Sequence, residues 1–308
     1  MTSRPNFFIA GAPKSGTTSL YTYLRSHPRI FMPQAKEPHY FAKDFVNYPA
    51  IREEADYLKL FKKSTEAHIA IGEASVWYLY SKVALDLIRD FNPDARIIIM
   101  LRNPVDLAYS MHGQALYNFN ETEPDFEKAW LLQNERAQGK HIPRGCRAEQ
   151  ILQYQALASL GHQVEHLLNV FPSRQVRILF FEEFIVDPAA TYRKVLSFLG
   201  VPDDGRNEFP RSNESKIHKS NFLGWLTQTP PPAVIKTNRF HRERLGISTA
   251  RPLAMLRRLN DIPLQRSALS TELRHTLIEV FLPDVELLSG ILETELGDWL
   301  EKGSNPYA

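Results

Sequence analysis

A short apolar run, a glycine-containing loop and a helical pattern follow one another between residues 6 and 24. Residues 7–10 read FFIA, which is the pattern of a strand buried on both faces. The run ends at Gly11 and Pro13, where a helix cannot continue, and apolar residues then recur at helical spacing as far as Leu24. This order of strand, loop and helix predicts an α/β fold with the loop at the N-terminus of the first helix.

The loop carries the groups that bind an anion. The first amides of a helix lack intrahelical partners and point at one spot, where an anion can sit. One lysine and several hydroxyl residues lie around Gly16: Lys14, Ser15, Thr17, Thr18 and Ser19. A lysine and hydroxyls add charge-assisted hydrogen bonds to such a site. The alternative interpretation is a plain turn whose hydroxyls only cap the helix.

The glycine spacing is close to that of nucleotide-binding loops, but the lysine is displaced. Gly11 and Gly16 have the expected separation, and Thr17 stands where a nucleotide triphosphatase has its lysine. In those enzymes that lysine reaches the terminal phosphates and the next hydroxyl holds Mg²⁺. With Lys14 before the second glycine, we expect a different phosphate-like group and no bound metal.

Further apolar runs alternate with helical patterns. Strands are predicted at 69–72, 95–101 and 176–181. Helices are predicted at 57–61, 83–91, 105–116, 151–170, 187–199, 253–259 and 272–299. The other segments read as a polar excursion at 118–148, which could line a substrate entrance or be a solvated connection, a basic loop at 209–222 and a proline-rich break at 228–232. Alternating strands and helices predict a central parallel sheet flanked by helices, and we expect one domain over residues 1–308.

Polar residues follow the predicted strands. Ligands of open parallel sheets bind beyond the carboxyl ends of the strands, so Gly11, Glu73 and Arg102 are expected at one edge. Arginine can bind a phosphate with two hydrogen bonds. Ser110 follows Arg102 by eight residues, about two helical turns, so both reach one phosphate only if the helix runs beside it.

The composition limits the class of protein. A net charge of +2 gives no bulk attraction to nucleic acid, and we expect no nucleic-acid partner. Cys146 is the single cysteine, so neither an intrachain disulfide nor a thiolate metal cluster can form. No apolar stretch has membrane-spanning length. These features, and a chain that begins almost at the predicted loop, lead us to expect a cytoplasmic protein of unspecified oligomeric state.

Taken together, the motifs resemble those of the sulfotransferases that use PAPS (3′-phosphoadenosine 5′-phosphosulfate). Residues 13–20, PKSGTTSL, resemble the loop that binds the 5′-phosphosulfate. Residues 36–41, KEPHYF, resemble a segment of the glucosaminyl sulfotransferases of heparan sulfate, and Arg102 with Ser110 resembles the 3′-phosphate motif. The resemblance runs in order from residue 6 to about 115. It implies a P-loop-kinase-like fold, PAPS as co-substrate and no metal. The product would be PAP, the same nucleotide without its sulfate.

The resemblance also implies roles for individual residues. Glu37 would be the general base, with His39 as the rival base, and Lys14 would stabilise the leaving phosphate. Cofactor binding would fall to Lys14, Ser15, Gly16, Thr17, Thr18, Ser19, Arg102 and Ser110, together with Lys216 and Lys219 of the basic loop.

Contact with the acceptor substrate is expected from Lys36, Glu73 and Trp77. Where this chain has residues 73–76, the resembling enzymes carry Glu-Lys-Thr-Pro, and the lysine of that motif assists catalysis. Here residues 73–76 read EASV, so that lysine is missing. Its absence favours an acceptor other than a polyanionic glycan, and Glu73 becomes either a substrate contact or a structural residue. Trp77 would line the acceptor site or pack in the core.

We therefore predict an enzyme that transfers a sulfuryl group from PAPS to a hydroxyl, less readily an amine, of a small or medium acceptor. That acceptor could be a glycan, a natural product, a lipid or a phenol. The alternatives are a P-loop nucleotide kinase or triphosphatase, and a non-catalytic protein of the same fold that binds a phosphorylated nucleotide.

Overall fold

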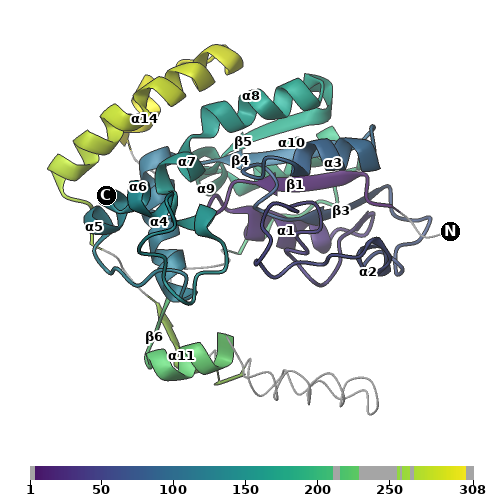
Figure 1. Cartoon of the computed structure of the whole chain (residues 1–308). Coiled ribbons are helices and arrows are strands. Elements are labelled where there is room, and N and C mark those ends of the chain that lie inside the picture. Colours follow the sequence, from purple (N-terminus) through teal and green to yellow (C-terminus); the bar gives the residue numbers. More distant parts are fainter. Residues whose placement is uncertain (1–3, 211–215, 229–254, 257–258, 264–266, 303–308) are drawn as a thin grey trace.

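A computed structural model describes residues 4–210, 216–228, 255–256, 259–263 and 267–302. Its centre is a five-stranded sheet in the order β2-β3-β1-β4-β5, and every neighbouring pair is parallel. The strands are β1 (Phe7–Gly11), β2 (Ile30–Phe31), β3 (Ala70–Ala74), β4 (Arg96–Leu101) and β5 (Val176–Phe180). The parallel sheet and its four longer strands confirm the sequence prediction (Figure 1).

Helices cover both faces of the sheet because its strands are apolar on both sides. On one face lie α1 (Thr17–Arg25), α9 (Phe181–Val186) and α10 (Pro188–Leu199). The other face packs against α3 (Ala84–Phe91), α4 (Pro104–Tyr117), α7 (Tyr154–Ala158), α8 (Leu160–Val170) and α14 (Thr271–Leu292). The remaining helices are α2 (Glu54–Lys59), α5 (Phe126–Leu131), α6 (Gln133–Arg136), α11 (Asn221–Gln228), α15 (Gly297–Lys302) and the short η1 (Glu149–Leu152) and η2 (Ser173–Gln175).

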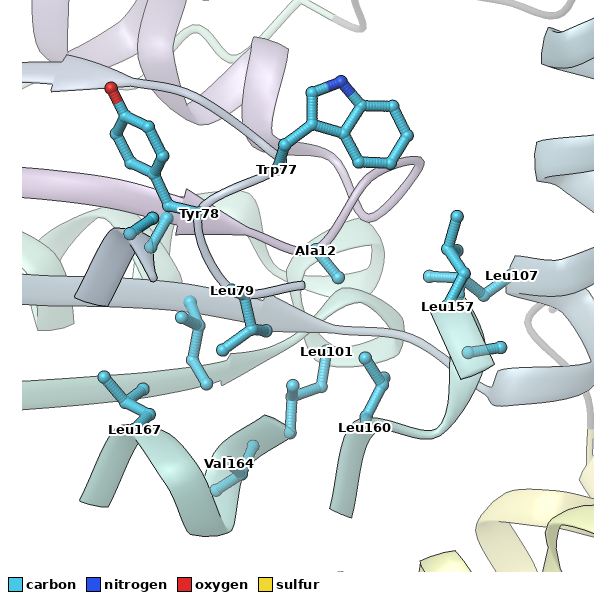
Figure 2. Close-up of a cluster of buried hydrophobic side chains, with 14 of the residues drawn as sticks. Ala12, Trp77, Tyr78, Leu79, Leu101, Leu107, Leu157, Leu160, Val164 and Leu167 are labelled. Carbon is cyan, nitrogen blue, oxygen red and sulfur yellow. The ribbon is translucent and has the colours of Figure 1, made fainter. Parts of the chain in front are cut away.

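Side chains along β4 alternate between the two apolar layers, as the pleat of a strand requires. Ile98 and Met100 pack with α1 and α10, whereas Ile99 and Leu101 pack on the opposite side. Figure 2 shows Leu101 pointing toward the leucines and valine of α8. Burial on both faces accounts for the uninterrupted apolar run in the sequence.

The turn between β4 and α4 is fixed by Asn103, which is completely buried. Its Oδ1 accepts hydrogen bonds from the amides of Val105 and Asp106 and so caps α4. Its Nδ2 donates to the carbonyl oxygens of Trp299 and Leu300, which attaches the C-terminal helix to the same turn. The start of α4, and with it the position of Arg102, is therefore set by tertiary contacts.

Three of the sequence predictions about elements were wrong in detail. The helix predicted over 151–170 is divided into η1, α7 and α8, because the Asp284 carboxylate of α14 accepts the amides of Gly161 and His162 and caps a new helix there. The helix over 272–299 ends at Leu292 and α15 follows. The basic loop contains a strand, β6 (Lys216–His218), which pairs antiparallel with β7 (Asp261–Pro263). Residues 229–232 of the proline-rich break, and residues 253–254 and 257–258 of the helix predicted over 253–259, lie outside the described residues.

The polar excursion at 118–148 contributes to the core rather than only to the surface. Glu121 and Arg136 are 2% and 1% exposed and form two hydrogen bonds of 2.6 and 2.8 Å. The Tyr154 hydroxyl donates to the same carboxylate at 2.7 Å. Two opposite charges joined by two hydrogen bonds can be buried together, which a polar stretch of sequence does not disclose.

Candidate active site

The candidate site lies at the carboxyl ends of three adjacent strands, β3, β1 and β4. Lys14 follows β1, Arg102 follows β4, and Glu37 is held against the end of β3, where its amide donates to the Ala74 carbonyl oxygen at 2.9 Å. The prediction that Gly11, Glu73 and Arg102 share one edge is confirmed for the backbone, although Gly11 and Glu73 lie within the ends of β1 and β3 and not after them. This edge is where open parallel sheets bind ligands.

The loop after β1 has the geometry of an anion site. Gly16 precedes α1 with φ 82°, a left-handed conformation that glycine adopts without strain. A Cβ atom there would lie 3.1 Å from ring atoms of Phe181 and Phe184. In the described part of the chain no side chain caps the N-terminus of α1. Ser15, Thr17 and Ser19 are buried and Thr18 is partly exposed at this helix end.

Lys14 reaches from this loop to α4. Its Nζ donates a hydrogen bond to Oε1 of Gln114 at 2.9 Å. Burial, and secondly the positive charge of Arg102, lowers the pKa of the Lys14 ammonium to about 8. The lysine is therefore a cation at neutral pH that an anionic ligand would stabilise.

Arg102 lies against the same loop. Its Nη1 donates to the carbonyl oxygen of Lys14 at 2.8 Å, and its guanidinium stacks over the Phe181 ring at 4.8 Å from the centroid. Burial lowers its pKa, although the carboxylates of Asp106 and Glu182 oppose this. The arginine and the lysine, 88 residues apart in sequence, thus form one cationic patch.

Ser110 lies partly exposed on α4, one helical turn before Gln114. Residues four apart project from the same face of a helix, so Ser110 faces the side on which Gln114 meets Lys14. The condition set by the sequence, that α4 run beside the phosphate bound by Arg102, stays a prediction. Gln114 itself was missed by sequence reasoning, and its four-residue spacing from Ser110 was the signal available.

Glu37 is fixed by its neighbours. Its side chain is 29% exposed and forms an ion pair with Lys36. One carboxylate oxygen, Oε2, accepts the amide of Val76 at 3.0 Å. Burial acts to raise its pKa, but the charge of Lys36 and the hydrogen bonds from Lys36 and the Val76 amide hold the pKa below its usual value. Glu37 is therefore an ionised carboxylate at neutral pH.

His39 supports that carboxylate. Its Nε2 lies 3.2 Å from Oε2 of Glu37, and its amide donates to the Ser75 hydroxyl at 3.0 Å. The side chain is 3% exposed, and burial lowers its pKa to about 4. A neutral imidazole that faces a carboxylate donates from the facing nitrogen, so the Nε2–H is directed at Glu37. Both residues have positive φ, 64° and 50°, in a loop held in an unusual conformation.

Two of the residues predicted to contact the acceptor are buried in the protein instead. Glu73 is 0% exposed and accepts hydrogen bonds from Tyr57, Tyr78 and Ser75. Burial raises its pKa to about 7. Trp77 is 4% exposed and stacks on Phe45, with ring centroids 5.4 Å apart. Neither side chain offers a surface to a substrate, which corrects the prediction in favour of the structural alternative.

The two lysines of the basic loop are not brought into this cluster by any described contact. Lys216 begins β6, and its side chain lies outside the described residues. Lys219 is exposed, and its amide donates to the Asn260 carbonyl oxygen. β6 packs on the end of α4 through His218, whose Nε2 lies 3.0 Å from the Tyr117 carbonyl oxygen. Their predicted role in cofactor binding stays a prediction.

A pocket of about 420 Å³ is lined by residues of the segments 44–47, 136–137 and 147–153. Its polar lining comes from Asp44, Asn47, Arg147, Glu149, Gln150 and Gln153. The ring of Tyr48 contacts His39 edge to face, with centroids 5.1 Å apart. Burial raises the pKa of the Tyr48 phenol, the charge of Glu37 raises it further and that of Arg147 lowers it. Tyr48 thus contacts His39 and carries the electrostatic influence of Glu37 and of Arg147, which lines the pocket.

Two kinds of feature are absent from the described residues, a cluster of metal-ligating side chains and a membrane-spanning helix. No group of three His, Cys, Asp or Glu side chains in that part of the chain could hold a metal ion. No described helix combines the length and apolarity needed to cross a bilayer.

Comparison with known proteins assigns the family. Residues 4–222 match the family model described as the sulfotransferase domain. Carbohydrate sulfotransferase 15 of Homo sapiens is 30% identical over 250 residues, covering 64% of this chain and 44% of that protein. Heparan sulfate glucosamine 3-O-sulfotransferase 3B1 of Homo sapiens is 30% identical over 197 residues, covering 64% and 46%. The chain thus spans less than half the length of these relatives.

Structural similarity extends further along the chain. The crystal structure of a sulfotransferase from Alicyclobacillus acidocaldarius superposes with a TM-score of 0.70 at 29% identity, covering 96% of this chain and 99% of that one. The fold of that protein is therefore the fold described above, including the helices that follow the matched domain. From its sequence and its fold alike, this chain belongs to the sulfotransferase family of enzymes.

Proposed function

We propose that this protein transfers the sulfuryl group of PAPS to a hydroxyl of an acceptor, releasing PAP. The observation that carries the proposal is the convergence of Lys14, Arg102 and Glu37 at three adjacent strand ends. Two cations suit the two phosphorylated positions of the donor, and a fixed carboxylate beside them suits an acceptor hydroxyl. The nucleotide kinase alternative lacks the lysine that would reach the terminal phosphates, since Thr17 stands at its position.

Sulfuryl transfer, like phosphoryl transfer, depends on positioning the reactants and stabilising charge more than on covalent catalysis by the protein. Glu37 takes the proton from the acceptor hydroxyl, whose oxygen forms the new bond to sulfur. The bond from sulfur to the 5′-phosphate oxygen breaks, and that oxygen leaves with the electron pair. Lys14, as an ammonium, stabilises the charge that develops there. Ser110, Arg102 and the amides before α1 hold the nucleotide in line.

In this proposal the acceptor binds in the pocket that Arg147 and Glu149 help to line. Its lining mixes the guanidinium of Arg147, the carboxylate of Glu149 and several amides, which offers both donors and acceptors of hydrogen bonds. Such a lining suits a polyhydroxylated molecule, and the names of the two human relatives specify carbohydrate and glucosamine acceptors. We therefore propose a saccharide hydroxyl as the acceptor.

A melting experiment tests the donor. A ligand at about 100 times its dissociation constant adds about 2.7 kcal/mol to the free energy of unfolding, which moves the melting temperature by several degrees. PAP should produce this shift, and AMP, which lacks the 3′-phosphate, should produce less. A shift with ATP and Mg²⁺ but none with PAP would contradict the proposal. Transfer of label from [³⁵S]PAPS to a panel of oligosaccharides then tests the acceptor.

A further inference from the structure

Gln114 is placed to control the predicted catalytic cation. Its Oε1 lies 2.9 Å from Nζ of Lys14, a residue 100 positions away in the sequence. An ammonium group offers only donors, so the group of Gln114 that meets it must be the amide oxygen. The contact favours the charged form of the lysine over the neutral amine.

Both ends of the Lys14 residue are attached to β4 and α4. Its carbonyl oxygen accepts from Arg102, which directly follows β4. Its ammonium binds Gln114 of α4, which follows Arg102 by 12 residues. Asn103 fixes the start of α4. The lysine side chain is therefore directed along the helix face that also carries Ser110.

The rest of the surroundings disfavours the charge that the reaction needs. Burial and the neighbouring Arg102 lower the pKa of Lys14 to about 8. A hydrogen bond from a charged donor is about twice as strong as one between neutral groups, so Gln114 opposes these effects. A carboxylate here would form an ion pair and hold the ammonium too tightly to release it. A neutral amide stabilises the cation and leaves its charge available to an anion.

We propose that Gln114 is a positioning residue that holds the Lys14 ammonium along α4 until a phosphate oxygen of the donor takes it over. The inference rests on the proposed function, because the donor supplies that oxygen. Only hydrogen bonds are exchanged: Nζ leaves the amide oxygen and binds the more negative phosphate oxygen, and no proton is transferred.

Direct titration of Lys14 tests the contact without needing an acceptor. The chain is labelled with ¹³C at lysine Cε, and the Lys14 signal is identified by its loss in Lys14→Met. Gln114→Met keeps the length of the side chain and removes the oxygen, so the pKa of Lys14 should fall by about one, a tenfold change. Gln114→Glu should raise it. Gln155→Met, on an exposed position of α7, should leave it unchanged.

The same titration with PAP bound tests whether the Lys14 ammonium leaves Gln114 for the phosphate. The 5′-phosphate should raise the pKa of Lys14, and Gln114→Met should then have no further effect. Equal pKa values of Lys14 in the wild type, Gln114→Met and Gln114→Glu would overturn the inference, and so would a response to Gln114→Met that PAP leaves undiminished. If PAP does not bind the wild type while both variants move the Lys14 pKa in opposite directions, the proposed function fails and the hold on the ammonium stands.

Discussion

The Arg102 guanidinium donates a hydrogen bond to the carbonyl oxygen of Lys14 over 2.8 Å, joining the ends of two neighbouring strands. An arginine can make this bond and still direct its other donors at a phosphate, since its guanidinium carries five N–H groups. Under the proposed function, a single residue thereby supports the loop proposed to bind the 5′-phosphosulfate and contacts the 3′-phosphate.

Substituting Arg102→Lys should weaken PAP binding at least tenfold, because one ammonium cannot bond the loop carbonyl and fork onto a phosphate. Titration calorimetry with PAP and with adenosine 5′-phosphosulfate, which has no 3′-phosphate, separates the two roles. The loss should be larger for PAP. Equal losses for both nucleotides would limit Arg102 to supporting the loop. Arg89→Lys, at an exposed ion pair on α3, serves as the control.

Glu37→Gln should lower kcat on the order of 10²–10⁴-fold with PAP affinity retained, because the amide keeps the shape and loses the basic oxygen. His39→Gln should cost less, about tenfold, since Nε2–H only orients the carboxylate. Steady-state kinetics with a labelled donor distinguishes them. The reverse order of effects would make His39 the base, and transfer unaffected by Glu37→Gln would leave the chain without the proposed mechanism.

The rate should fall in alkaline solution as Lys14 loses its proton. Its pKa in the free protein is about 8, so the ammonium is present below that pH and is lost as the pH rises through it. The pH profile of kcat/KM for PAPS reports groups of the enzyme without bound nucleotide, and it should show this alkaline limb near pH 8. Lys14→Arg keeps a charge that does not titrate, and we expect a slower enzyme whose alkaline limb is absent. A limb that persists in this variant would have to come from another group.

Glu73 should make the protein less stable as the pH rises. Its pKa is 4.5 in the unfolded chain and about 7 when buried, so between these values the folded state binds a proton that the unfolded state releases. Stability is then lost across this window, by roughly 3 kcal/mol in total. Urea unfolding of Glu73→Gln should show a gain over the wild type that grows from pH 4.5 to pH 7.5. A constant difference would contradict this, and the exposed Glu127→Gln provides the reference.

Arg136→Met should destabilise the fold by about 3–5 kcal/mol, because it leaves the Glu121 carboxylate buried without its counter-charge. Arg193→Met breaks an exposed pair with Asp203 and should cost far less, because solvent screens that pair. Adding Glu121→Gln to Arg136→Met should recover part of the loss. Chemical denaturation measures all three. Similar effects from the buried and the exposed arginine would show that the interior tolerates an unpaired carboxylate.

Local sequence determined the strands and the donor loop. The runs at 7–10 and 97–101 are apolar at every position because both faces of the sheet are covered, and glycine is required at residue 16 by its left-handed conformation. The apolar runs and the glycine are features of residues adjacent in sequence, so they can be recognised without the fold. They predicted the parallel sheet, the residues at its edge and the family to which the chain belongs.

Only the tertiary structure decided how side chains distant in sequence pair with one another. Gln114 meets Lys14, and Glu121 meets Arg136, because helices pack against a sheet in one particular register. The sequence does not distinguish a polar residue that faces solvent from one that faces a buried partner, so it left Glu73 as either a substrate contact or a structural residue. Its three hydroxyl donors in the core decide for the structural role. The cost of burying a charge is met by its partner, and the partner is set by the fold.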